Sequence, residues 1–233
     1  MTAIMRRELN SYFTSPIGYV YLAVFYLLCG FMYTQVIASG YSSMSYVFSY
    51  IFTFCMFLVP ILTMRLMSED RKQKTDQLLL TAPVSLTEHV MGKFLAALIV
   101  YTLGIAVTIL QAFVISLYTT VNWAVFAGSF VGILLLGAAC IGIGMFISSL
   151  TENQVIAAVA GFAVMLFLSL FDSLADLVSI SWLKSVVLGM SFYTRFYDLT
   201  LGVLDFADIF FFLSVAAVFI FLTSRVLEKR RWS

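Results

Sequence analysis

The stretch that decides the fold runs from Val125 to Leu150 and reads VFAGSFVGILLLGAACIGIGMFISSL. It contains no Asp, Glu, Lys, Arg or His. A helix needs roughly 20 predominantly apolar residues to cross the roughly 30 Å hydrocarbon core of a lipid bilayer. This stretch therefore predicts a transmembrane helix.

Five further apolar runs flank this stretch on both sides. They are Ile17–Ile37, Tyr46–Met64, Phe94–Tyr118, Gln154–Phe171 and about Phe206–Ser224. Hydrophobic residues make up 62% of the 233 residues and charged residues only 11%, whereas soluble domains are nearer half apolar. We therefore expect an all-α membrane protein with six transmembrane helices, organised as a single domain over residues 1–233.

The positions of the basic residues indicate the orientation, because cytoplasmic loops of membrane proteins are enriched in Lys and Arg. With the N-terminus in the cytoplasm, six spans leave only Lys184 and Arg195 outside. The basic residues that then fall inside are Arg6, Arg7, Arg65, Arg71, Lys72, Lys74, Lys93, Arg225, Lys229, Arg230 and Arg231. This distribution predicts that both termini are cytoplasmic. We also expect the protein to lie, as a multi-pass protein, among the lipids of the inner, cytoplasmic membrane of the cell.

Two segments outside the spans are expected to lie along the membrane. Residues 1–16 combine charged and apolar side chains in a pattern typical of an interfacial helix, which Pro16 ends. Residues 172–205, on the outer side, are too apolar for an exposed loop, but their apolar pieces are too short to span. They predict short interfacial or re-entrant helices between the fifth and sixth spans.

The sizeable cytoplasmic loop covers residues 65–93 and is expected to be structured. Charged pairs four residues apart favour a helix from about Glu69 to Ala82, which Pro83 ends. These pairs are Asp70 with Lys74 and Lys72 with Asp76, and Leu78, Leu79 and Leu80 give the helix an apolar edge. The loop therefore predicts a polar cytoplasmic helix between the second and third spans.

Two pairs of polar residues match the capping box, in which a Ser or Thr caps a helix and a Glu or Gln follows three residues later. Ser85 with Glu88 predicts that the third helix begins near Leu86, before the membrane. Thr151 with Gln154 predicts the start of the fifth helix. The turn between the fourth and fifth spans is therefore too short to hold a domain.

The ionisable residues disfavour several classes of membrane protein. No Asp, Glu, Lys, Arg or His lies between Glu8 and Arg65, and the middles of the other spans are also uncharged. Ion-coupled transporters usually keep a charged group at membrane depth to bind the coupling ion. A membrane-embedded enzyme would need an acid, a base, a nucleophile or a metal cluster, and His89 is interpreted as a solvated residue at a helix start. We expect no catalytic, cofactor or metal site in this chain.

The sequence also lacks the phosphate loop of an ATPase. That motif needs Gly, four residues and then Gly-Lys followed by Ser or Thr, whereas Gly92-Lys93 is preceded by Thr87 at the first position and followed by Phe94. Cys29, Cys55 and Cys140 lie inside predicted spans without a CxxC pattern, and they are interpreted as small buried hydrophobic residues.

Small residues four positions apart mark places where helices can approach closely. They are Gly128 with Gly132, Ala138 with Gly142, Gly144 with Ser148, and Ala157 with Gly161. Packing within one chain and packing between two chains both fit this pattern. Gln35 and Gln111 either face a cavity or bond to a neighbouring helix.

Several motifs in order resemble one family, the type-2 ABC exporter permeases, particularly the branch of gliding motility and nitrous-oxide-reductase maturation. They are Glu8-Leu9 through Tyr12-Phe13 with Ser15-Pro16, then Thr75 to Val84 (TDQLLLTAPV), Gly92-Lys93, Gly142 to Gln154 (GIGMFISSLTENQ) and Gly202-Val203-Leu204-Asp205. The likeness covers nearly the whole chain. Lys74 stands where the family has Gly and Asp76 where it has Glu, so the contacts of the cytoplasmic helix are expected to differ from those of relatives.

The resemblance implies the membrane subunit of an ATP-driven transporter, without an ATPase site of its own. Its expected partners are two copies of a separate ABC ATPase that holds ATP and Mg²⁺, a second permease chain (identical or related), and membrane lipids, with no nucleic acid. The residues expected to couple to the ATPase are Glu69, Asp70, Arg71, Lys72, Lys74, Asp76, Leu78, Leu79, Leu80, Thr151, Glu152 and Asn153.

The resemblance also implies a central cavity between two permease chains, lined partly by the second and fifth spans. The candidate lining residues are Tyr50, Phe54, Gln111 and Met165. The alternative functions are a secondary transporter or channel without an ATPase, and a membrane-embedded enzyme. Neither the cargo nor the direction of its transport follows from the sequence.

Overall fold

The computed structural model describes residues 1–39, 44–73, 85–171, 182, 184, 188–202 and 205–231, and all its regular elements in these ranges are helices. These helices are α1 (Thr2–Thr14), α2 (Pro16–Ala38), α3 (Met44–Thr63), α4 (Ser68–Lys72), α6 (Leu86–Ile105), α7 (Val107–Ser116), α8 (Trp123–Leu150), α9 (Gln154–Ser169), α12 (Phe192–Thr200) and α13 (Phe206–Arg231). The expectation of an all-α protein is confirmed for the described residues.

Five helical segments are long and apolar enough to cross a membrane. They are Pro16–Ala38, Met44–Lys72, Leu86–Ser116, Trp123–Leu150 and Phe206–Arg230. The predicted fifth span forms α9, an apolar helix of 16 residues that is shorter than the other five. The sequence therefore located the apolar helices correctly, while the total of six crossings stays a prediction.

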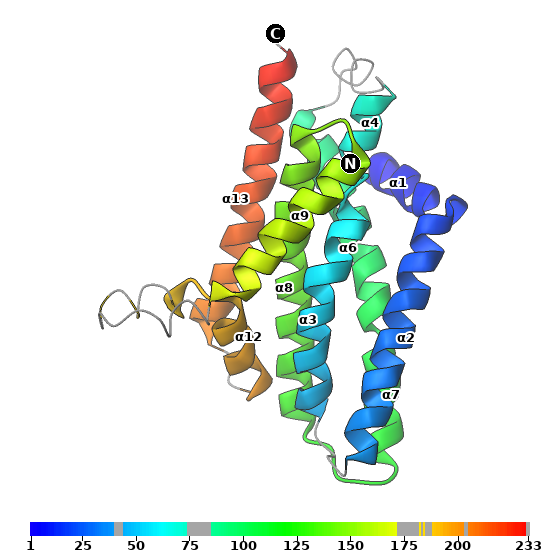
Figure 1. Cartoon of the computed structure of the whole chain (residues 1–233), viewed down its shortest axis with the longest axis vertical. Coiled ribbons are helices and arrows are strands. Elements are labelled where there is room, and N and C mark those ends of the chain that lie inside the picture. Colours follow the sequence, from blue (N-terminus) through cyan, green and yellow to red (C-terminus); the bar gives the residue numbers. More distant parts are fainter. Residues whose placement is uncertain are drawn as a thin grey trace.

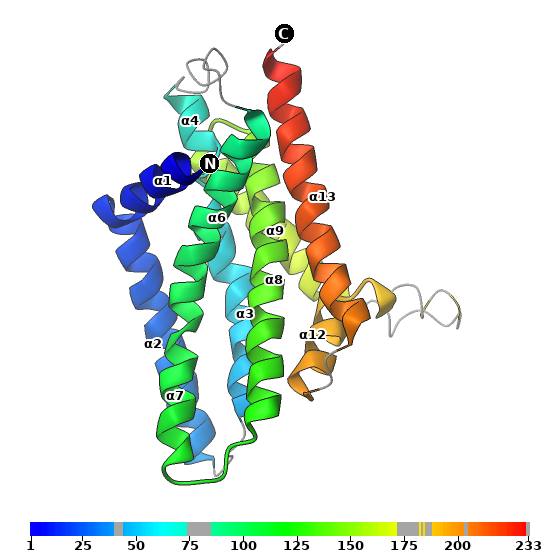
Figure 2. The same cartoon turned by 180° about the vertical axis from the view of Figure 1, so that it is seen from behind.

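The helices form an elongated bundle, with both chain termini towards the same end (Figure 1). We call this end, where α1, α4 and the last turns of α13 lie, the terminal end. The connection from α7 to α8 lies at the opposite, far end, together with the end of α2 and the start of α3 (Figures 1 and 2). The helix is interrupted at Ala106, between α6 and α7, where the Thr108 hydroxyl donates to the Ile105 carbonyl at 2.8 Å.

α8 forms the centre of the bundle and packs against α13, α3, α12, α9 and α6. Its small residues permit this close packing. A Cβ atom on Gly144 would lie 2.2 Å from the Thr63 hydroxyl of α3, and one on Gly142 would lie 3.3 Å from the Ala216 backbone of α13. On α9, a Cβ atom on Gly161 would lie 3.3 Å from Pro60. These glycines make contacts within one chain, in agreement with the interpretation of the small residues as sites of packing within the chain.

α1 is a separate helix that lies across the terminal end of α2 and α6 (Figures 1 and 2). It ends at Thr14, and Pro16 begins α2, so the predicted end of the first helix is confirmed. Gly92 lets α1 approach α6, because a Cβ atom there would lie 3.0 Å from Ile4 Cγ2. α1 is therefore packed on the bundle as well as amphipathic.

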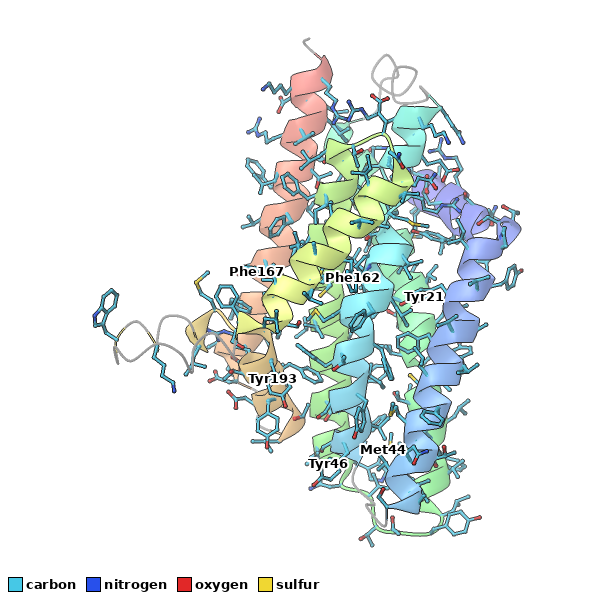
Figure 3. The ribbon with its side chains drawn as sticks, viewed as in Figure 1. Tyr21, Met44, Tyr46, Phe162, Phe167 and Tyr193 are labelled. Atoms are coloured by element: carbon cyan, nitrogen blue, oxygen red, sulfur yellow. The ribbon has the colours of Figure 1, made fainter. Side chains whose placement is uncertain are left out.

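The segment before the last span contains α12, a short amphipathic helix. Phe196 and Leu199 are buried against α3 and α8, and Phe192 is buried against α13, while Tyr193 and Tyr197 are exposed. Figure 3 shows Tyr193 beside the far half of α3. The predicted short helix between the fifth and sixth spans is thus present over residues 192–200, and most of residues 172–187 lie outside the described ranges.

Candidate transmission site at the terminal end

The polar residues that follow α3 form a tight turn and then the five-residue helix α4. Ser148 of α8 holds this turn: its hydroxyl accepts hydrogen bonds from the amides of Met67 and Ser68, both at 3.1 Å, and donates one to Met64 O at 2.8 Å. The Ser148 side chain is fully buried. A buried hydroxyl that satisfies three backbone groups fixes the direction in which α4 leaves α3.

Glu69, the first charged residue of α4, is connected to the junction of α1 and α2 through Arg65. Arg65 Nε lies 3.1 Å from Glu69 Oε2, and the same guanidinium donates to Ser15 Oγ at 2.7 Å and to Ser11 Oγ. The guanidinium also lies 5.2 Å from the centre of the Tyr12 ring. Arg65 is only 6% exposed, so one buried cation joins α4 to the end of α1.

Asp70, the second charged residue, faces the first turns of α6. Its Oδ2 lies 2.9 Å from Lys93 Nζ and 3.3 Å from His89 Nε2. The Lys93 ammonium also lies 2.9 Å from Glu8 Oε1 of α1 and donates to Leu66 O at 2.6 Å. Lys93 is 1% exposed, so a buried ammonium shared by two carboxylates joins α1, α4 and α6.

The interpretation of His89 as a solvated residue was wrong. His89 is 6% exposed and contacts Asp70, because α1 and α4 cover the start of α6.

Arg71, the third charged residue, faces the junction of α8 and α9. Its Nε lies 2.8 Å from Glu152 Oε1, and its NH1 donates to Leu150 O at 2.9 Å. Arg230 of α13 donates to the neighbouring carbonyl of Ser149. The last carbonyls of a helix have no partner within it and favour cations. Two arginines therefore bind the end of α8, one from α4 and one from the last helix.

The remaining predicted coupling residues are exposed or lie outside the described residues. Lys72 is exposed at the end of α4, and Glu152 and Asn153 are exposed in the turn before α9. A pocket of about 310 Å³ opens between these two places, lined by Lys72, Glu152, Asn153, Gln154 and Val155. The residues outside the described ranges are Lys74, Asp76, Leu78, Leu79 and Leu80, so the predicted helix is seen only over Ser68–Lys72.

The start of α9 differs from the predicted capping box. Asn153, and not Thr151, is the N-cap: its Oδ1 accepts from the Val155 amide at 2.9 Å. Thr151 Oγ1 instead accepts from the Asn153 amide at 3.2 Å. An Asn side chain caps as well as a Thr, and its position next to the helix decides between them. The other predicted cap is confirmed, since Ser85 accepts from the Glu88 amide and α6 begins at Leu86.

The four candidate cavity residues do not share one surface within this chain. Tyr50 is 45% exposed on an open stripe of α3 that continues through Phe57 and Ile61. Phe54 is partly buried, and Met165 is fully buried in the core. Gln111 lies on α7, where its backbone carbonyl accepts a hydrogen bond from Tyr33 of α2. Tyr50 alone faces outward, and the role of all four residues stays a prediction.

Sequence reasoning did not find Lys93, Glu8 and Ser148 as structural residues of this site. Lys93 was counted only among the inside charges, because nothing in the sequence shows that a lysine near the start of an apolar run will be buried by a distant helix. A polar pocket of about 250 Å³ borders it, between α1 and α4. No group of His, Cys, Asp and Glu able to hold a metal ion occurs among the described residues.

Comparison with known families supports the role of a transporter subunit. The model of the ABC-2 family transporter proteins matches residues 17–225. The chain belongs to this family. No curated protein matches the chain. Members of this family are membrane subunits of ABC transporters that work with an ATPase subunit and have no ATPase site of their own. The narrower resemblance to the gliding-motility and nitrous-oxide-reductase-maturation branch stays a prediction.

Proposed function

We propose that this chain is the permease subunit of an ABC exporter in the inner membrane, with six spans and both termini in the cytoplasm. Two permease chains, identical or related, assemble with two copies of a separate ATPase, and the ATPase binds ATP and Mg²⁺. The family supports the permease role. The distribution of Lys and Arg supports the orientation.

The sixth crossing in this proposal is α9. Its 16 residues reach about 24 Å at 1.5 Å per residue, which is a few ångströms less than a hydrocarbon core of roughly 30 Å. A short span is accommodated by local thinning of the bilayer. Its exposed residues are apolar, among them Val155, Val159 and Phe167, and they suit a lipid or protein contact inside the membrane.

One observation carries the proposed mechanism: three consecutive charged residues of α4 connect to three different parts of the bundle. Glu69 reaches the α1–α2 junction through Arg65, Asp70 binds His89 and Lys93 of α6, and Arg71 binds the α8–α9 turn. A helix held on three sides cannot move without moving its neighbours. α4 therefore passes a displacement to several spans at once.

The residues that follow α4 are proposed to receive this displacement from the ATPase. Asp70 precedes residues 74–84 in the chain and His89 follows them, and the contact between these two side chains holds the ends of the loop together. The apolar residues Leu78–Leu80 and the exposed charge of Lys72 suit a docking surface with an apolar centre and a polar rim. The exposed residues Glu152 and Asn153 form the second part of this surface.

The open stripe of α3 is proposed to face a cavity between two permease chains. Tyr50, Phe57 and Ile61 are exposed along one side of α3. Phe57 contacts Phe162 of α9, with ring centres 5.0 Å apart, so α3 and α9 border the same surface, as Figure 3 shows for Phe162. The proposal therefore keeps Tyr50 in the lining and leaves Phe54, Gln111 and Met165 as weaker candidates.

Isolation of the protein from native membranes in a mild detergent tests the proposed function. A companion protein with a phosphate-loop ATPase motif should copurify with it. Reversing the exposed charge with Lys72→Glu should reduce this recovery, whereas Lys229→Glu, on the last helix, should not. If no ATPase copurifies under conditions that keep the permease folded, the proposed function is wrong.

A further inference from the structure

The helix α12 is joined to the rest of the chain by a cap at one end and a glycine turn at the other. Ser191 caps its start by accepting from the Thr194 amide at 3.1 Å. At its end, Gly202 has a φ of 82°, a conformation that glycine adopts without a steric penalty. α12 is therefore a short rigid element between two turns.

Arg195 of α12 makes three contacts that converge on the start of α13. Its NH1 lies 2.7 Å from Asp208 Oδ1, its Nε donates to Gly189 O at 2.8 Å, and its guanidinium lies 4.5 Å from the centre of the Phe211 ring. Asp208 is 5% exposed. This ion pair joins α12 to α13.

Apolar side chains make the other close contacts of α12 with α8 and α3. Leu199 sits over Gly132 and Gly128 of α8, where a Cβ atom on Gly128 would lie 2.8 Å from Leu199 O. Phe196 stacks on Phe52 of α3, with ring centres 5.3 Å apart. A hydrogen bond from Ser45 Oγ of α3 to Thr200 O at 3.3 Å accompanies these contacts. The Arg195–Asp208 pair adds a charged restraint on α12.

We infer that the Arg195–Asp208 pair is a latch that holds α12 closed over the far half of α3 and α8. When the pair breaks, α12 turns about Gly202 away from this surface. The buried Asp208 carboxylate suits this task, because loss of its cationic partner leaves an uncompensated charge and the pair therefore has two distinct states. Opening of the latch during the transport cycle depends on the proposed function. The existence of the latch does not depend on it.

Distance measurements between spin labels test the latch without cargo. One label is placed at Tyr197 of α12, which is 45% exposed, and one at Ala124 at the start of α8. The native cysteines, all buried, are replaced by Ala in this background. The variants are Asp208→Asn, which removes the charge, and Arg195→Lys, which keeps the charge but loses the planar contact with Phe211. Asp198→Asn, an exposed carboxylate on the same helix, is the matched control.

The wild type and the control should give one narrow distance. Asp208→Asn should raise the population of a second, longer distance by about tenfold, and Arg195→Lys should raise it less. The exchanged pair, Arg195→Asp with Asp208→Arg, should return most of the population to the narrow distance. This recovery separates a latch from general unfolding. If the single variants match the control, or if a folded exchanged pair stays as open as Asp208→Asn, the latch is refuted.

A second measurement separates the latch from the proposed function. Addition of ATP and vanadate to the complex with its ATPase should raise the open population of the wild type. If Asp208→Asn opens α12 but nucleotide changes nothing, the latch stands and the proposed coupling to an ATPase fails. If nucleotide opens α12 and Asp208→Asn does not, the coupling stands and the latch fails.

Discussion

The Lys93 ammonium of α6 lies 2.9 Å from the Glu8 carboxylate of α1, with the lysine side chain 2% exposed and the glutamate side chain 11% exposed. Because Asp70 of α4 shares the same ammonium, three elements meet at one buried cation. Burial makes each member of this cluster depend on the others, since an ion that loses its partner keeps its desolvation penalty.

Removal of the cation should therefore destabilise the whole terminal end. Lys93→Met keeps much of the side-chain length but leaves Glu8 and Asp70 without their ammonium, and it should cost about 3–5 kcal/mol of unfolding free energy. Lys72→Met, at an exposed position, should change stability by less than about 0.5 kcal/mol. Unfolding in mixed micelles gives both values. The triple variant Lys93→Met, Glu8→Gln, Asp70→Asn should recover part of the loss, and no recovery would show that charge pairing is not the cause.

Ser148 should be necessary for the direction of α4. Ser148→Ala leaves the amides of Met67 and Ser68 without their acceptor, and a buried donor without a partner costs about 1–3 kcal/mol. Ser129 is the matched control on the same helix, because it is equally buried but donates only to Val125 O within α8. Thermal unfolding in detergent should show a clear loss for Ser148→Ala and little change for Ser129→Ala. Equal losses would contradict the assignment.

The close approach of α6 to α8 predicts a second contrast. A Cβ atom on Gly137 would lie 2.0 Å from Tyr101 Cε1, whereas one on Gly30 would meet nothing within 4 Å. Gly137→Ala should overpack the core and cost about 1–3 kcal/mol. Gly30→Ala should be neutral or should stabilise by up to about 1 kcal/mol through helix propensity. Both variants are compared by unfolding in the same detergent, and a neutral Gly137→Ala would show that the bundle is looser there.

The orientation can be tested with an impermeant thiol reagent on intact cells. The native cysteines are buried and should give little background. A cysteine at Thr119, exposed at the far end, should react from outside, whereas one at Lys72, exposed at the terminal end, should react only after the cells are opened. The reverse pattern would place both termini outside.

The positions of the apolar helices were predictable from the sequence because a bilayer imposes a length and a composition on each helix that crosses it. The starts of α6 and α2 also followed, since Ser85 and Pro16 act through local geometry. The sequence also located α9 correctly. Hydropathy did not predict that this helix is shorter than the other apolar helices.

The polar cluster was not predictable, because its pairs join residues far apart in the chain. Glu8 meets Lys93, and Arg71 meets Glu152, only after the bundle has formed. His89 shows the same limit. Its neighbours in sequence indicate a solvated helix start, and only the packing of α1 and α4 buries it. The capping-box pattern of Thr151 with Gln154 also gave the wrong N-cap. Two side chains that can cap a helix, Thr151 and Asn153, lie within three residues, and Asn153 caps α9.

An exchange of charge between Arg71 and Glu152 tests the central claim, which is that α4 transmits the movement of the ATPase to the bundle. The readout is the permease-dependent change in the ATP hydrolysis rate of the reconstituted complex, measured together with ATPase binding. Arg71→Glu alone should abolish most of this change while the ATPase stays bound. Glu152→Arg alone should also weaken ATPase binding, because Glu152 lies on the proposed docking surface. The double exchange should restore a substantial part of the change in hydrolysis rate. If each single variant binds the ATPase and retains the wild-type response, α4 is not the transmission element.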